Sequence, residues 1–284
     1  MLQNPCDQRY TVGVPRFLQL PDHGRLIIGT DMQGNLRDFQ QLATHFRACG
    51  PDAHLLLTGD LVHGPDDQTA QEWPDHLGTP YVDESPALVD EFLEQQRLAP
   101  GRVHCLMGNH DHAHLGGPVT SKFHDDEAGV LESMLGPAGT LRLQKLVSTF
   151  PLVAWAPCGA VMLHGAPAAE IQSASQLEDI TIDGYAGYDI ERFIRVPILG
   201  SLLWSRMATA DQSKRFLEAL NGTIAIYGHD VVREGFERVG EDQLCFSTSF
   251  GLFDEHKVYV SLDLAAKYPD VFALREGVEI LPLY

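Results

Sequence analysis

The chain of 284 residues is 44 % hydrophobic and 21 % charged, the balance of a globular protein with a sizeable core. Its net charge of −19 argues against a nucleic-acid polymer or an anionic membrane as a partner, because both require a basic face. Five scattered cysteines indicate reduced thiols. Because there is neither a signal-peptide core nor an apolar stretch of roughly 20 residues, we expect a cytoplasmic location without a membrane span.

Five short apolar runs predict the buried strands of an α/β fold. They cover residues 26–28, 54–57, 103–107, 160–163 and 224–227. Between the first two runs, apolar residues at helical spacing predict a helix over 35–48 with Asn35 as its cap, and therefore a parallel strand–helix–strand unit. No repeat is visible, so we expect one domain over 1–284 with its core at about 25–265.

The remaining segments predict a second sheet and two regions that border the site. We expect a polar loop over 65–86, a helix over 86–98 and a helical insert over 116–144 that breaks at Gly136 and Pro137. Segments 152–155 and 160–163 predict a hairpin. A helix over 211–220 and strands over 223–227, 244–247 and 258–262 complete two sheets packed together, with helices outside.

Each of the five apolar runs ends in a polar cluster. The clusters are Asp31-Met32-Gln33-Gly34-Asn35, Gly59-Asp60, Gly108-Asn109-His110-Asp111, His164-Gly165 and Gly228-His229. Ligands of open α/β sheets collect beyond the carboxyl ends of strands, and carboxylate, amide and imidazole groups suit Mn, Fe or Zn. Two such metals about 3.5–4 Å apart acidify a bridging water and clamp phosphate oxygens. The set therefore predicts a dinuclear metallophosphoesterase.

The predicted site assigns a role to each polar residue. Asp60 bridges the two metals and is, with His110, a catalytic residue; His110 donates the proton to the leaving alkoxide. The remaining metal ligands are Asp31, Gln33, Asn109, His164 and His229. Any single cluster is more often an ordinary turn than a ligand, but the ordered occurrence of all five favours the metal site. By contrast, we expect His112 and His114 to be loop histidines rather than a metal-binding tract.

These blocks resemble the calcineurin-like metallophosphoesterases, whose motifs run D-x-H, G-D, G-N-H-[DE], H and G-H. Segments 195–205 and 228–237 are similar to the serine/threonine phosphoprotein phosphatase branch in particular. The resemblance implies a four-layer α/β/β/α sandwich with two mixed sheets and two divalent metal ions, with Mn favoured and Fe, Zn or Mg as alternatives. It also implies attack by a metal-bound hydroxide on a phosphoprotein or a small phosphomonoester, held by Arg195, Asn109 and His110.

The sequence departs from that branch in its first two motifs. Gln33 stands where the family has histidine, and because a neutral amide is a weaker donor, we expect one metal to bind loosely. The second motif, at 59–64, lacks the aspartate that orients the catalytic histidine and the adjacent phosphate-binding arginine. Asp66 and Asp67 are candidates to replace that aspartate.

Two other functions stay open at this point. Residues 59–65 also look like bacterial dinucleoside polyphosphatases, which would make the substrate a nucleotide or a phosphodiester. Gln33 and the altered second motif are also compatible with a degenerate site that serves as a binding or regulatory module. The sequence does not fix the physiological substrate or the oligomeric state.

Overall fold

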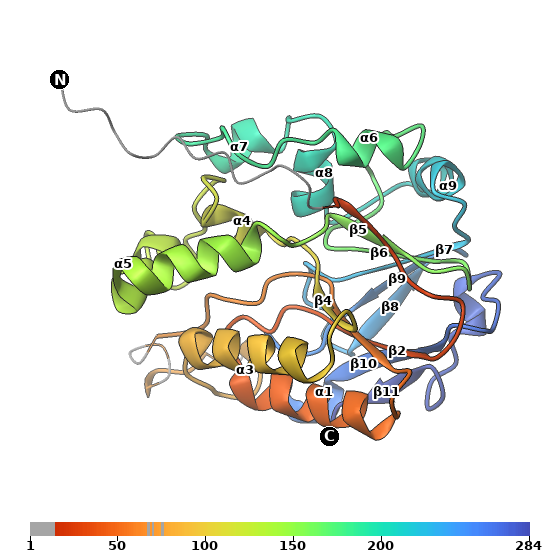
Figure 1. Cartoon of the computed structure of the whole chain (residues 1–284), viewed down its shortest axis with the longest axis horizontal. Coiled ribbons are helices and arrows are strands. Elements are labelled where there is room, and N and C mark those ends of the chain that lie inside the picture. Colours follow the sequence, from red (N-terminus) through yellow and green to blue (C-terminus); the bar gives the residue numbers. More distant parts are fainter. Residues whose placement is uncertain (1–14, 67–68, 70, 75–76) are drawn as a thin grey trace.

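The computed structural model describes residues 15–66, 69, 71–74 and 77–284, and its elements form four layers (Figure 1). The helices α1 (Leu36–Ala48) and α3 (Ser85–Leu98) cover one sheet, and α6 (Ser175–Glu178), α8 (Leu199–Trp204) and α9 (Ala210–Ala219) lie beyond the other. The remaining α-helices of the described part are α4 (Asn109–Ala113), α5 (Glu127–Val147) and α7 (Ile190–Phe193). None of the described helices combines the length and the apolar character that a membrane crossing requires.

Both sheets are mixed, which confirms the predicted sandwich. The first has the order β11 (Ile280–Pro282), β10 (Val258–Asp263), β2 (Arg25–Gly29), β3 (His54–Leu57) and β4 (Val103–Cys105). The second has the order β1 (Phe17–Gln19), β5 (Val153–Trp155), β6 (Ala160–Leu163), β7 (Ile224–Tyr227), β9 (Gln243–Phe246) and β8 (Phe236–Val239). Strands β2, β3 and β4 run parallel, as do β6, β7 and β9, so their carboxyl ends point the same way within each sheet.

The alternation of side chains along β2 shows how the layers are held together. Leu26 and Ile28 are fully buried between the two sheets, whereas Ile27 joins the core on the helix side with Phe39 of α1. Because both faces of the strand are covered, its sequence is a continuous apolar run rather than an alternating one. Each such side chain contributes about 1.5–3 kcal/mol when buried, so the packing holds the strand ends in a fixed position.

The predicted elements are confirmed where they are long or buried. Asn35 caps α1 by accepting a hydrogen bond from the Asp38 backbone N–H, and β5 pairs antiparallel with β6 as the predicted hairpin. The helical insert predicted over 116–144 is helical only from Glu127, where α5 begins, and its predicted break lies at Gly136, where φ is 65°. The strands β1, β8 and β11 were not predicted. All three are sheet edges of three or four residues, which is too short for the alternation or the length of apolar run that marks a strand.

A buried ion pair ties α1 to β10. The Lys257 ammonium lies 2.8 Å from an Asp38 carboxylate oxygen, and the side chains are 1 % and 0 % exposed. Ser249 donates to the same oxygen at 2.6 Å, and the Tyr284 hydroxyl donates to the other at 2.5 Å. The four groups join helix, sheet, a loop next to the site and the C-terminal residue in one charged cluster.

We expect Lys257→Met to lower the free energy of unfolding by about 3–5 kcal/mol, because it leaves the Asp38 charge buried without a cation. The measurement is urea unfolding followed by circular dichroism. Asp90→Asn is the control: Asp90 pairs with Arg142 on the surface, so its loss should change stability by less than about 0.5 kcal/mol. Equal effects of the two substitutions would contradict a structural role for the buried pair.

Candidate functional site

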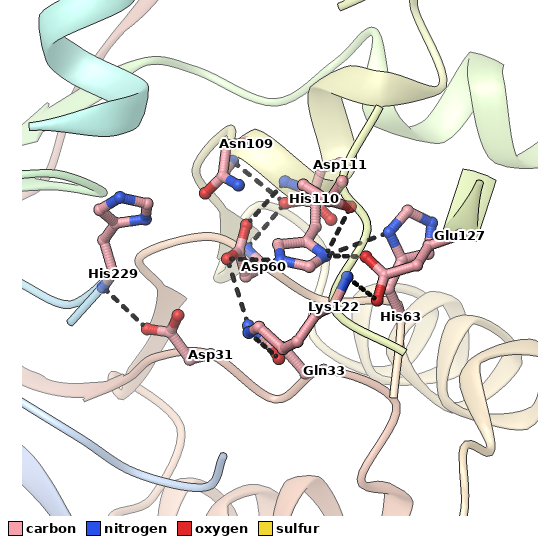
Figure 2. A network of polar contacts seen from close by, with 12 residues as sticks. Asp31, Gln33, Asp60, His63, Asn109, His110, Asp111, Lys122, Glu127 and His229 are labelled. Atoms are coloured by element: carbon pink, nitrogen blue, oxygen red, sulfur yellow. Dashed lines mark hydrogen bonds and ion pairs between the residues drawn. The ribbon is translucent and has the colours of Figure 1, made fainter. Parts of the chain in front are cut away.

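The five polar clusters of the sequence meet where the carboxyl ends of the two sheets come together. Asp31, Asp60 and Asn109 follow β2, β3 and β4 of one sheet, while His164 and His229 follow β6 and β7 of the other. Figure 2 shows Asp31, Asn109 and His229 arranged around Asp60, with His110 and Lys122 close by. Strands far apart in the sequence therefore deliver their polar ends to one place.

Four donor atoms converge around His164. Its Nε2 atom lies 2.9 Å from Asn109 Oδ1, 3.1 Å from His229 Nδ1 and 3.5 Å from Asp60 Oδ1. His164 Nδ1 lies 3.1 Å from the Thr58 carbonyl and donates its hydrogen to it, so Nε2 carries a lone pair. Burial lowers the pKa of both imidazoles, which keeps them neutral. Such a convergence of lone pairs fits a transition-metal cation, and Asp60, His164 and His229 form a candidate ligand group.

A second set of groups surrounds the other side of Asp60. Gln33 Nε2 donates to Asp60 Oδ2 at 3.4 Å, and Lys122 Nζ donates to Gln33 Oε1 at 3.0 Å. Lys122 is an exposed residue, and its ammonium lies 3.9 Å from the centre of the Phe250 ring. Burial raises the pKa of the Asp60 carboxyl, and the nearby Asp31 charge raises it further. The Gln33 amide oxygen is thus already engaged by a positive charge.

The backbone at the site is held in an unusual conformation. Seven non-glycine residues of the described part have positive φ, and five of them belong to the site or contact it: Asp31, Gln33, Asp60, His63 and His229. Left-handed backbone costs such residues about 1–2 kcal/mol each, and it persists only where the surrounding packing over-determines it. The scaffold therefore stabilises turns that aim these side chains inward.

His110 lies between the metal-ligand set and a group of buried polar side chains. Its backbone N–H donates to Asp60 Oδ1 at 3.0 Å, and its Nε2 lies 4.0 Å from Asp60 Oδ2. Its Nδ1 lies 3.1 Å from His63 Nδ1, 3.2 Å from Thr120 Oγ1 and 3.5 Å from Glu127 Oε2. The polar neighbours of its outer nitrogen are therefore a histidine, a threonine and a glutamate rather than an aspartate.

Of the two candidates to replace the missing aspartate, Asp66 does not contact His110. Asp66 accepts a hydrogen bond from the Thr69 N–H and lies 3.9 Å from His124, and none of its described contacts is to His110. Asp67 lies outside the described residues. The residue that contacts His110 from the second motif is His63, which occupies the position where the phosphatase branch has aspartate.

The expectation that His112 and His114 are loop histidines is wrong. His112 lies in α4 and His114 caps its end, and both are buried. His112 Nε2 lies 2.7 Å from the Ile182 carbonyl, whereas His114 contacts His63 and Glu132. A spacing of two residues between His112 and His114 is not a helical pattern, and α4 is too short to show one.

A cavity of about 230 Å³ opens beside the convergent donors. It is lined by Gln33, Asp60, Asn109, His110, Thr120, Ser121, Lys122, Ile190, Trp204, Arg206 and His229. The cations Lys122 and Arg206 were not among the predicted site residues. No periodic pattern singles out Lys122, which lies in an irregular segment ahead of α5, and Arg206 follows α8 directly in the sequence.

Arg195, which the resemblance assigns to phosphate contact, is not brought to this cavity. Its side chain is 75 % exposed and forms an ion pair with Glu191 at 2.6 Å, one helical turn earlier. Arg206 lies at the cavity wall instead, where it donates to the His229 carbonyl at 3.2 Å and to Asp230 at 2.7 Å.

The fold and the convergent carboxylate, amide and imidazole donors define a metal-dependent phosphoesterase. A family model described as calcineurin-like phosphoesterase matches residues 17–233, about three-quarters of the chain. The chain belongs to the calcineurin-like phosphoesterase family and is a hydrolase.

Similar solved structures have the same fold at low sequence identity. A serine/threonine phosphatase from Saccharomyces cerevisiae, described as similar to human phosphatase PP5, is 15 % identical with a TM-score of 0.60 and is matched over 88 % of this chain and 77 % of that one. A cold-active protein-tyrosine phosphatase of a psychrophilic Shewanella species is 14 % identical with a TM-score of 0.56, over 90 % and 79 %. Comparison with curated protein sequences finds no significant match.

We expect Gly108→Ala to disrupt the site. A Cβ atom at position 108 would collide with the backbone nitrogen and the carboxylate of Asp60, and both are fixed by the turn. Stability should fall by several kcal/mol, and Mn²⁺ affinity with it. Gly101→Ala is the control, because position 101 has a φ of +71° but no atom within 4 Å, so only about 1 kcal/mol of backbone strain is expected. Thermal unfolding and calorimetric Mn²⁺ titration measure both, and equal effects would refute the steric argument.

Proposed function

We propose that this chain is a metal-dependent phosphatase that hydrolyses phosphomonoesters, carried either by a protein or by a small molecule. The observation that carries the proposal is the convergence of Asp60, Asn109, His164 and His229 on one point with His110 beside them. The cavity of about 230 Å³ is smaller than most organic-ligand sites, which favours entry of a phosphoryl group over burial of a whole nucleotide.

The donor set fits the divalent cations of the family. Asp60, Asn109, His164 and His229 would hold one cation, and Asp31, Gln33 and Asp60 a second, with Mn²⁺ favoured by the mixed oxygen and nitrogen donors. Bound cations would supply positive charge to the phosphoryl oxygens and lower the pKa of water. The second cation should bind more weakly, because the Lys122 ammonium competes for the Gln33 oxygen.

The protein side chains contribute binding and proton transfer. Lys122 and Arg206 reach the cavity from two sides and would bind phosphoryl oxygens through charge-assisted hydrogen bonds, together with the Asn109 amide. His110 directs Nε2 toward Asp60 and the cavity, which suits a general acid that protonates the leaving oxygen. Product alcohol and phosphate then leave without a covalent enzyme intermediate.

We expect hydrolysis of phenyl phosphate with Mn²⁺, and a loss of kcat of about 10²–10⁴-fold in His110→Asn. Asp60→Asn should abolish both turnover and tight metal binding. Arg206→Ala should raise KM about tenfold through one lost charge-assisted hydrogen bond, while Arg195→Ala should leave KM unchanged. The reverse result for the two arginines would favour the role that the family resemblance gives to Arg195.

The same assay separates the other functions. A strong preference for diadenosine tetraphosphate over phenyl phosphate and a phosphopeptide would replace the monoester by a nucleotide. A protein that binds no metal and turns over none of these substrates with Mn, Fe, Zn, Mg or Ni would be a binding module instead.

We expect metal binding in two unequal steps, measured by calorimetric Mn²⁺ titration. Gln33→His should strengthen the weaker step about tenfold or more, because imidazole is a better donor than an amide. Lys122→Met should also strengthen the weaker binding step, because it removes a competing positive charge. Gln33→His and Lys122→Met change the two partners of one hydrogen bond, so comparing the two variants tests the competition directly. His45→Gln is the control, since His45 is a histidine of α1 remote from the ligands. Two equally tight steps in the unmodified protein would contradict the argument.

A further inference from the structure

A chain of three imidazoles runs from the cavity to a carboxylate at the surface. His110 Nδ1 lies 3.1 Å from His63 Nδ1, and His63 Nε2 lies 2.9 Å from His114 Nε2. His114 Nδ1 in turn lies 2.9 Å from Glu132 Oε1 on α5. We propose that this histidine chain (His110, His63 and His114, ending at Glu132) positions His110 for proton donation in place of the missing aspartate. The inference rests on the proposed function and makes His63, His114 and Glu132 positioning residues.

The carboxylate at the outer end sets the direction of every hydrogen bond. The hydrogen bond from His114 lowers the pKa of Glu132, so Glu132 is an ionised acceptor and His114 Nδ1 must donate to it. With the hydrogen of His114 on Nδ1, its Nε2 atom accepts from His63 Nε2–H, which leaves His63 Nδ1 as an acceptor. His110 therefore donates from Nδ1, and one tautomer of each ring satisfies the whole chain. Nε2 of His110 then holds a lone pair, so it takes up a proton from water in the cavity before it gives that proton to the leaving oxygen.

The position of the Glu132 charge explains why the histidine chain suits this site. The three imidazoles are 2–3 % exposed, whereas the Glu132 side chain is 33 % exposed and keeps part of its hydration. The site already holds the buried carboxylates of Asp60 and Glu127, and a further buried charge next to His110 would be costly. The rings link Glu132 to His110 through hydrogen bonds, so Glu132 can orient His110 while its own charge stays near the surface.

The imidazole ring of His110 therefore cannot turn freely. With Nδ1 held by His63, the other nitrogen of His110 is fixed toward the Asp60 side of the cavity, 4.0 Å from Oδ2. Hydrogen-bond partners behind an imidazole orient it in the same way in metal sites and catalytic triads. Glu127 lies beside the chain without joining it: its Oε1 accepts from the backbone N–H groups of Lys122 and Phe123, and its Oε2, 3.5 Å from His110 Nδ1, forms no hydrogen bond with that ring.

The same atoms offer one competing interpretation. His63, His110 and Glu127 each present a ligand atom within 4.8 Å of the others, which is also a possible metal site. The hydrogen-bond pattern favours positioning, because it accounts for both nitrogens of His63 and for the two nitrogens of His114. Metal binding by this trio is therefore kept as an outcome of the experiment.

The experiment compares substrates that differ in their need for a proton donor. 2,4-Dinitrophenyl phosphate has a leaving group that departs as an anion, whereas phenyl phosphate requires protonation of its leaving oxygen. For phenyl phosphate with Mn²⁺, we expect kcat to fall roughly tenfold in Glu132→Gln and roughly 100-fold in His63→Ala. For the dinitrophenyl ester each fall should stay below about threefold, with KM and Mn²⁺ content unchanged. His63→Asp should recover part of the kcat that His63→Ala loses on phenyl phosphate, since it places a carboxylate beside His110, while the added buried charge should lower the stability of the variant.

The control is Glu94→Gln, which removes an exposed carboxylate paired with Arg97 on α3 and should change nothing. Equal falls on both substrates would show a merely structural role and overturn the proposal. Loss of bound metal from His63→Ala with the Asp60 and His164 ligands intact would overturn it in favour of the metal site. Failure of the unmodified protein to hydrolyse either ester would instead refute the proposed function.

A second measurement needs no turnover. In ¹⁵N-histidine NMR of the protein loaded with diamagnetic Zn²⁺, we expect hydrogens on Nδ1 of His114, Nε2 of His63 and Nδ1 of His110. Glu132→Gln, in which the side chain can both donate and accept, should release this pattern at His114 and His63. An unchanged set of tautomers in that variant would contradict control by Glu132, and Glu132 is exposed enough that the variant should fold.

Discussion

The buried carboxylate of Asp60 is the constraint on which the rest of the site depends. It is 1 % exposed, and burial together with the charge of Asp31 raises its pKa, so the ionised form needs positive charge close by. The protein supplies hydrogen bonds from the His110 N–H and the Gln33 amide, and Lys122 adds an ammonium one contact further out. These groups compensate the charge only partly, and a cation held by Asp60, His164 and His229 would complete the balance.

Asp111 is another buried carboxylate of the site, and its pKa depends on the charge of Asp60. Asp111 Oδ2 accepts from the backbone N–H groups of Asp60 and Gly108, and Oδ1 accepts from Leu61. It therefore fastens the loop after β3 to the loop after β4, the two that carry Asp60 and Asn109. Burial and the neighbouring Asp60 raise the pKa of Asp111 to about 7, so the loops are joined at an electrostatic cost that a bound cation would reduce.

The part of the site that the sequence predicted is the part that strands deliver. Parallel strands end at one edge, so apolar runs followed by Asp60, Asn109 or His164 predict convergence without any knowledge of contacts. Lys122, Glu132 and Arg206 could not be found in that way. They reach the site from irregular segments or from helix α5, where the approach depends on how the layers pack, and no periodicity in the sequence records that packing.

The helical insert brings carboxylates close to the place where the second motif departs from the phosphatase branch. His63 replaces a carboxylate that relatives of the phosphatase branch carry in the second motif, and the nearest new carboxylates, Glu127 and Glu132, both lie on the first turns of α5. Since α5 packs against α4, which begins at Asn109, the helix is fixed to the element that carries His110. The second motif, taken alone, indicates only that its aspartate is missing. Only the packing of α5 on α4 shows that carboxylates lie near this place, with Glu127 buried beside His110 and Glu132 paired with His114.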